Sequence, residues 1–180
     1  MDRTRGVTLI ELMVTLSVMA ILMAVGAPSL QTFVRNNQLR TAANEMQVAL
    51  GYARSEAIKR GVPVTVCKSA DISAVSPACS SSNAVSWRSG WLVFADLNQD
   101  GVVDTSGTTP DTVLRVGGGD SSGPVITPSG FTHFVSYLPG GTAVGGSGVT
   151  SGSFGFCHYG EGLTLEVSVT GRAQMSQVTC

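Results

Sequence analysis

Glu11 is the only charged residue within an apolar run that extends from Val7 to Ala27. An ionised carboxylate is poorly tolerated in a membrane unless a cation neutralises it. By chain geometry, the nearest cation is the free amine at the start of a neighbouring helix, if the chain is cleaved after Gly6. Because Glu11 lies only about 6 Å along the helix from Val7, its side chain could instead reach the membrane surface. We expect Glu11 to act in contacts between subunits, with surface snorkelling as the alternative.

The four cysteines could form disulfides or bind a metal, and all of them lie in the later part of the chain. An even number of cysteines in an exported domain predicts disulfides. Three pairings are open, and sequence proximity favours Cys67 with Cys79 and Cys157 with Cys180. A zinc site is disfavoured because the chain has no C-x-x-C pair and neither histidine has zinc-finger spacing.

The segment "DLNQDGVVD" resembles the start of a calcium-binding loop. Oxygen-bearing side chains fall at positions one, three, five and nine of such a loop: Asp96, Asn98, Asp100 and Asp104. Position twelve is Gly107, however, where a bidentate Glu is needed, and the same residue types suit a hairpin turn. We predict a turn between two strands, keep calcium as the weaker alternative and expect no cofactor.

Catalytic motifs are absent from the sequence. It contains neither a G-x-S-x-G elbow nor an H-E-x-x-H motif, and His158 and Glu161 stand in a turn-like "CHYGEG" segment. Trp87, Trp91 and Phe94 are expected in the core and at its rim, not in a ligand platform. The sequence therefore predicts a protein that is not an enzyme.

The apolar run that carries Glu11 has the length of a membrane-spanning helix. As a helix, Val7–Ala27 would measure about 31 Å, close to one hydrocarbon core. Arg3 and Arg5 precede it, which favours a cytoplasmic N-terminus. Unlike a secretory signal, the run continues through Pro28 into a further helix. We predict a single-pass membrane helix with the rest of the chain outside the cytoplasm.

After Pro28 the pattern becomes that of an amphipathic helix. Apolar residues recur at steps of three and four and form one stripe: Leu39, Ala42, Ala43, Met46, Ala49, Leu50, Ala53 and Ala57. Polar residues, Arg54 among them, are expected on the solvent face. Gly61 can cap the helix and Pro63 prevents its continuation. The helix should therefore run from about residue 8 to about residue 60 and pack its stripe on a sheet.

The remaining residues favour short strands joined by turns. Strands are predicted at 63–67, 90–96, 112–116, 134–138, 153–157, 163–169 and 173–178. Since no helices intervene, the strands should pair antiparallel. The glycine-rich segment 140–152 is expected to be a flexible loop. This part carries four Lys or Arg against eight Asp or Glu and is therefore mildly acidic.

The N-terminal stretch "RGVTLIELMVTLSVMAILMAVGAP" resembles the class III signal of type IV pilins and type II secretion pseudopilins. In that family a prepilin peptidase cuts after the glycine, here Gly6, and methylates the new first residue, here Val7. The family usually has Phe at this position, so Val7 is a departure. The resemblance implies that Glu11 is the residue that recruits the subunit, and we name Glu11 and Pro28 as the candidate assembly residues.

Later segments narrow the resemblance to the FimT, FimU and GspH group of minor pilins and pseudopilins. They are "ALGYARSEAIKRGVPVTVC", "WRSGWLVFADLNQDGVVD", "VLRV" and the pair Gly171 and Arg172. The resemblance implies an α+β pilin-like fold, in which a long N-terminal helix packs on an antiparallel β-sheet domain. It divides the chain into a leader (1–6), a transmembrane and assembly helix (7–28), an amphipathic helix (29–60) and a β-rich globular domain (61–180).

The same resemblance implies a location and partners. The subunit would wait in the bacterial inner membrane with its globular domain in the periplasm, and would then join the tip of a pilus or pseudopilus. Its partners would be prepilin peptidase and, through the N-terminal helices, other minor pilins and the major pilin.

Three functions remain open at this point. A type IV minor pilin that primes or caps assembly leads, and a GspH-like secretion pseudopilin follows because it shares every motif used here. The third is a DNA receptor, since some FimT relatives resemble receptors that use arginines after the Gly-Arg pair. Here Arg172 is present, but Gln174 occupies the second basic position. A DNA surface needs several cations, so DNA binding is disfavoured.

Overall fold

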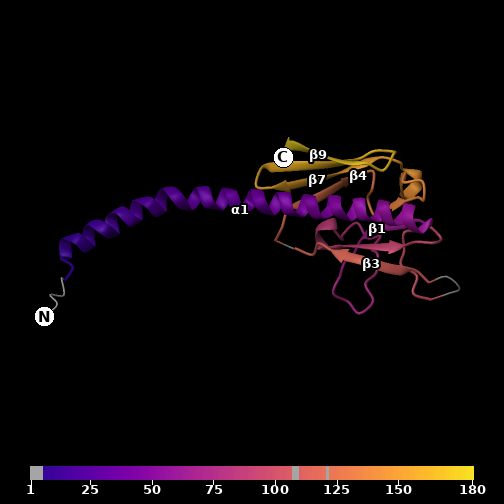
Figure 1. Cartoon of the computed structure of the whole chain (residues 1–180), viewed down its shortest axis with the longest axis horizontal. Helices are drawn as coiled ribbons and strands as arrows, with labels where there is room; N and C mark the ends of the chain where they lie inside the picture. Colours follow the sequence, from indigo (N-terminus) through magenta and orange to yellow (C-terminus); the bar gives the residue numbers. More distant parts are fainter. Residues whose placement is uncertain (1–5, 107–109, 121) are drawn as a thin grey trace. The chain divides into compact units, whose positions relative to one another are not determined.

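One long helix, α1 (Leu9–Arg60), confirms the N-terminal helix that the sequence predicts (Figure 1). The chain divides into two compact units, the first ending at Asn37 and the second covering Gln38–Cys180. The protein is known here from a computed structural model, which describes residues 6–106, 110–120 and 122–180.

Local sequence signals set both ends of α1. At its start, the backbone N–H of Glu11 donates to the Thr8 hydroxyl oxygen at 3.3 Å, as expected for a threonine N-cap. At its end, Gly61 adopts a φ of +67° and its N–H donates to the Ala57 carbonyl at 3.0 Å. Glycine takes this conformation without steric cost, so the predicted cap at Gly61 is confirmed.

The strands form two antiparallel sheets in the second unit. The five-stranded sheet has the order β3-β2-β1-β5-β6, with β1 Val64–Lys68, β2 Trp91–Ala95, β3 Thr112–Gly117, β5 Phe134–Tyr137 and β6 Ala143–Gly145. The four-stranded sheet has the order β4-β7-β8-β9, with β4 Val125–Ser129, β7 Gly152–His158, β8 Glu161–Val167 and β9 Ala173–Thr179. The predicted α+β class with antiparallel pairing is therefore confirmed.

The apolar stripe of α1 lies between the two sheets. In Figure 1 the labels β4, β7 and β9 stand on one side of the second half of α1, and β1 and β3 on the other. Seven of the eight predicted stripe residues are buried: Leu39, Ala43, Met46, Ala49, Leu50, Ala53 and Ala57. They share one hydrophobic cluster with side chains from both sheets, among them Val66, Val93, Phe154 and Leu165. Because four of the seven are alanines, the backbone of α1 can approach the strands closely.

The tryptophans and Phe94 also occupy the core, as expected. Trp87, Trp91 and Phe94 are at most 3% exposed. Trp87 packs edge to face on Phe154 with ring centroids 5.0 Å apart, and its indole N–H donates to the Thr132 carbonyl at 3.1 Å. A buried indole that satisfies its only donor in this way is a structural residue.

The segment 140–152 is not the flexible loop that its composition suggests. Strand β6 lies within it and pairs with β5, and Ala143 is fully buried. Its glycines have a packing role, because a Cβ on Gly145 would lie 2.6 Å from the Phe131 ring and a Cβ on Gly152 would lie 2.8 Å from it. The prediction was wrong because the aromatic ring that fills this space comes from a different part of the sequence.

Two disulfides fasten the second unit. Cys67 is joined to Cys79 and Cys157 to Cys180, the pairing that sequence proximity favours. The first closes the loop that follows β1, and the second lies between β7 and the end of β9. Each closure removes conformational freedom from the unfolded chain, an effect of about 3 kcal/mol.

Candidate functional site

The first unit presents apolar side chains around the whole circumference of α1. Runs of consecutive apolar residues such as Leu12–Val14 and Ile21–Met23 are all more than half exposed. The best 18-residue window has a mean hydropathy of 2.3, and none of it is buried, so α1 has the length and composition to cross a membrane. A helix that is apolar on every side requires lipid or other helices around it.

Glu11 interrupts this apolar surface near the start of the helix. It stands three residues after Thr8, the T-x-x-E spacing of a capping box, and its N–H donates to the Thr8 hydroxyl oxygen. Its side chain is exposed, and in the described part of the chain its carboxylate forms no ion pair. The positive end of the helix dipole offsets part of the charge. Thr8 was missed in the sequence interpretation, although the capping-box spacing could have identified it.

Gly6 and Val7 are exposed and precede the helix without regular secondary structure. A peptidase that hydrolyses the bond between them would find it in an exposed segment outside the helix. The rest of the expected leader, residues 1–5, lies outside the described residues. Pro28 lies within α1, but its side chain is outside the description.

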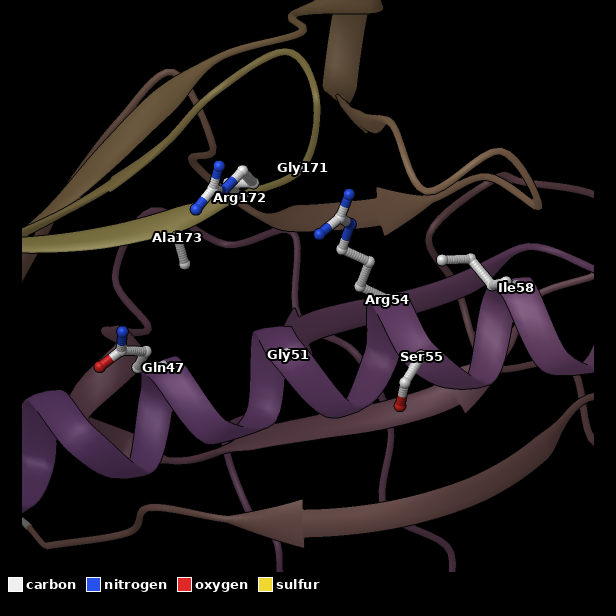
Figure 2. Close-up of a pocket in the computed structure, with 8 residues that line it drawn as sticks. All are labelled: Gln47, Gly51, Arg54, Ser55, Ile58, Gly171, Arg172 and Ala173. Carbon is white, nitrogen blue, oxygen red and sulfur yellow. The ribbon is translucent and has the colours of Figure 1, made fainter.

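The second unit contains a groove of about 350 Å³ between α1 and the turn that joins β8 to β9 (Figure 2). Four of its lining residues are polar or charged. The full lining is Gln47, Gly51, Arg54, Ser55, Ile58, Gly171, Arg172 and Ala173. The Gly-Arg pair noted in the sequence thus meets the helix at this groove.

Gly171 occupies a position that other residues would not fit. It has a φ of +74°, and a Cβ there would collide with the carbonyl oxygen of Gly141 and approach the Tyr137 ring at 3.0 Å. Arg54 reaches the same carbonyl, since its Nε donates to the Gly141 oxygen at 3.0 Å. Arg54 is therefore half-buried and anchored, which corrects its expected place on the solvent face of the helix.

Tyr137 lies beneath this contact, fully buried. Its hydroxyl has no hydrogen-bond partner among the described residues. Burial raises the pKa of the Tyr137 hydroxyl, and the nearby charge of Arg54 opposes this only in part. The hydroxyl is therefore neutral at physiological pH, and the groove derives its charge from the arginines.

The predicted calcium candidates are brought together, but as a hydrogen-bonded turn. The Asp96 carboxylate is buried and accepts from the Thr65 hydroxyl at 2.7 Å and from the backbone N–H of Gln99 and Gly101 at 2.8 and 3.1 Å. Burial raises the Asp96 pKa, while these donors lower it.

The other three candidates bond one another. The Asn98 amide donates to Asp100 at 2.9 Å and to Asp104 at 3.0 Å. Strands β2 and β3 on either side pair antiparallel, as the turn prediction requires. Among the residues that the structure describes, no group of acidic, His or Cys side chains could hold a metal; Gly107 lies outside them.

A second polar cluster lies behind the loop that the Cys67–Cys79 disulfide closes. Lys68 is buried, and its Nζ donates to the Ser82 carbonyl at 2.9 Å. Burial lowers the Lys68 pKa. Burial first, and then the charge of Lys68, lowers the pKa of His133, whose Nδ1 is buried without a partner among the described residues. Lys68 is enclosed and bonded to this loop, and His133 is half-buried beside it, so we assign the cluster a structural role.

Two parts of the chain match different family descriptions. Residues 42–171 match the family described as type II transport protein GspH, and residues 1–27 match the prokaryotic N-terminal methylation motif. A comparison with curated proteins gives no match.

Two crystal structures of the type IV minor pilin FimU from Pseudomonas aeruginosa (strain PAO1) are similar in fold. One has a TM-score of 0.52 at 22% identity and covers 77% of this chain and 92% of FimU. The other has a TM-score of 0.55 at 23% identity and covers 80% and 92%.

Proposed function

The chain belongs to the GspH family of pilins and pseudopilins, and we propose that within this family it is a minor pilin of a type IV pilus that helps to prime or cap assembly. Members of the family are structural and do not catalyse reactions. The methylation motif implies processing by prepilin peptidase and assembly with other pilins, and the apolar helix is typical of prepilins in the inner membrane.

The exposed carboxylate of Glu11, which has no ion-pair partner among the described residues, carries the assembly step of this proposal, a step that a pseudopilin would share. Hydrolysis of the bond between Gly6 and Val7 would release the leader and leave a free amine on Val7. In a membrane, helices associate by packing and polar contacts, because lipid is as apolar as their side chains. A Glu11 carboxylate that meets the Val7 amine of a neighbouring subunit would lose its unpaired charge, which gives the helices a reason to associate at a defined register.

The proposed topology follows from the same processing. Residues 7–28 would span the inner membrane with the leader in the cytoplasm. Residues 29–60 would continue the helix into the periplasm, where the globular domain folds. Oxidising conditions there suit the two disulfides. The assembled subunit would stand at or near the tip of the filament, in contact with other minor pilins and the major pilin.

A pseudopilin of a type II secretion system is the second candidate, favoured by the description of the family that residues 42–171 match. Deletion of the gene separates the two. For a minor pilin, we expect surface pili to fall while secreted enzymes are unchanged. Normal piliation with lost secretion would replace the pilus proposal by the pseudopilin. Complementation with the wild-type gene is the control for both measurements.

A DNA receptor is the third candidate, and the groove gives it little support. Arg172 is exposed, but its neighbours in the adjoining hollow include Glu166 and Gln174, so the cations do not form a continuous stripe. A phosphate backbone binds through several released counterions. A mobility shift of the full chain at two salt concentrations tests this candidate, and a salt-sensitive shift would restore it.

A further inference from the structure

We propose that the groove lined by Arg54 and Arg172 binds a carboxylate side chain of a neighbouring filament subunit. This inference rests on the proposed function, because it takes the neighbour to be another pilin. It concerns the globular domain, and is therefore separate from the contact that Glu11 would make through the helices.

The two guanidinium groups have unused donors. Arg54 uses its Nε–H on the Gly141 carbonyl, and its terminal nitrogens have no bond to a described residue. Arg172 is exposed, and no side-chain hydrogen bond holds it within the described chain. The ion pairs formed among the described residues join Glu56 to Lys59 and Arg60, so neither groove arginine has a carboxylate partner. In Figure 2 both guanidinium groups lie on the same side of the helix ribbon.

One of the two guanidinium groups is ordered before a ligand arrives. The bond from Arg54 to Gly141 fixes that guanidinium, and Gly171, which packs against the same carbonyl, places Arg172 next in the chain. An arginine that is already ordered loses less side-chain entropy on binding. Guanidinium groups also match the two oxygens of a carboxylate in geometry as well as in charge.

The remaining lining favours an amino-acid side chain over a free anion. Ile58 is 54% exposed at the groove and offers an apolar contact for the methylenes of a glutamate. Gln47 also lines the groove, whereas the Ser55 hydroxyl points away from the guanidinium groups in Figure 2 and donates to the Tyr52 carbonyl at 2.8 Å.

The electrostatics argue against a nucleic acid. The segment 61–180 has twice as many acidic as basic residues, and Glu166 lines the hollow on the other side of Arg172. A phosphate chain would be repelled beyond the two arginines, whereas a single carboxylate would contact only the groove.

Binding of a model carboxylate peptide tests the proposal. The full chain in a non-ionic detergent is titrated into an end-capped, fluorescein-labelled tetraglutamate peptide, and anisotropy is followed at low salt. The uncharged tetraglutamine peptide is the ligand control. Arg115→Gln is the matched protein control, because Arg115 is an exposed arginine on β3 in the other sheet.

We expect tetraglutamate to bind and tetraglutamine not to bind. Arg172→Gln and Arg54→Gln should each weaken binding at least about fivefold, the double variant should abolish it, and Arg115→Gln should leave it unchanged. Arg172→Gln carries the test if Arg54→Gln does not fold, since the Arg172 side chain has no bond within the described chain.

Equal binding of the two peptides, or unchanged binding by the double variant, would overturn the proposal. Displacement of the peptide by a thymidine oligonucleotide at lower concentration than by unlabelled tetraglutamate would also overturn it, in favour of a nucleic acid. Failure of peptide binding in a chain that still enters pili refutes the groove alone. Failure of the gene deletion to affect pili refutes the minor-pilin proposal alone.

Discussion

The Nε of Arg54 donates a hydrogen bond of 3.0 Å to the carbonyl oxygen of Gly141, 87 residues later in the chain. The same oxygen limits the space at Gly171, so α1, the turn between β5 and β6 and the turn between β8 and β9 meet at one atom. A further bond of 3.3 Å, from the Ala143 N–H to the Val169 carbonyl, joins β6 of one sheet to the turn between β8 and β9 of the other. This point couples the helix to both sheets.

Replacement of Gly171 by alanine should lower the free energy of unfolding of the second unit by about 1–3 kcal/mol. The added Cβ meets the Gly141 carbonyl, and the positive φ is strained for any residue with a Cβ. Denaturant unfolding followed by the fluorescence of Trp87 and Trp91 measures the change. Gly140→Ala is the control, because nothing lies within 4 Å of its Cβ position. Equal stability of the two variants would contradict the packing role of Gly171.

The stability of the second unit should fall as the pH is lowered from 7.5 to 5.5, in part through His133. Its folded pKa lies below the ordinary value of 6.5, so the unfolded chain takes up the proton more readily. The contribution of neutral His133 to the stability of the folded unit is therefore complete above pH 6.5. It is lost as the pH falls through the folded pKa. The variant His133→Asn has no titrating group at this position, so it should lose less free energy of unfolding between the two pH values than wild type. The control variant His158→Gln keeps the His133 ring and should lose as much as wild type.

If wild type and His133→Asn lose the same free energy of unfolding between the two pH values, the partial burial of His133 beside Lys68 has no role in the pH dependence.

Removal of the Cys157–Cys180 disulfide should lower the free energy of unfolding by about 2–4 kcal/mol. We expect the double variant Cys157→Ser, Cys180→Ser to lose hydrogen-exchange protection first in β9, because this bond ties the end of that strand to β7. Protection in β1 and β2, next to the other disulfide, should change least. Uniform loss of protection across both sheets would show that β9 does not open separately.

Glu11→Gln separates a role of charge from a role in helix capping. Glutamine keeps the capping-box chemistry with Thr8 but cannot neutralise an amine. We expect Glu11→Gln and Glu11→Ala each to enter sheared pili several-fold less than wild type, and Thr8→Ala to be close to wild type. Glu45→Ala, an exposed acid later in α1, is the control. Normal incorporation of Glu11→Gln would assign Glu11 to capping.

The mature protein should begin with N-methylated Val7. Intact-mass measurement of the subunit from membranes should show the loss of residues 1–6 and the gain of one methyl group. Gly6→Leu should leave the leader attached. A mature chain that begins elsewhere would displace the amine and remove the proposed partner of Glu11.

Local patterns predicted most of the fold. The stripe on α1 and the cap at Gly61 depend on spacing within a few turns of helix, and the structure confirms both. Strand β4 was missed because Pro128 interrupts its pattern; proline is tolerated there since β4 is an edge strand. Strand β6 was missed because its Gly145 makes room for Phe131, a contact that no local pattern contains.

One candidate site could be predicted from local sequence and the other could not. The capping-box spacing of Thr8 and Glu11 is visible in the sequence. The groove is not visible in the sequence, because Arg54 and Arg172 lie far apart in the chain and line it together only in the folded domain. The periodic pattern of the helix also places Arg54 among ordinary solvated residues. In the structure both arginines line one groove, and the Gly141 carbonyl receives Arg54 while it excludes a side chain at Gly171.

The alanine-rich stripe of α1 also constrains how the protein can be produced in water. A fragment that starts after Arg60 would lack α1, which covers apolar side chains of both sheets. These side chains would then be exposed to solvent, and the fragment should aggregate. A fragment that starts near Gln38, where the second unit begins, retains Leu39 and every later stripe residue. It omits the exposed apolar part of α1. Crystallisation and antibody production should therefore begin from the longer fragment.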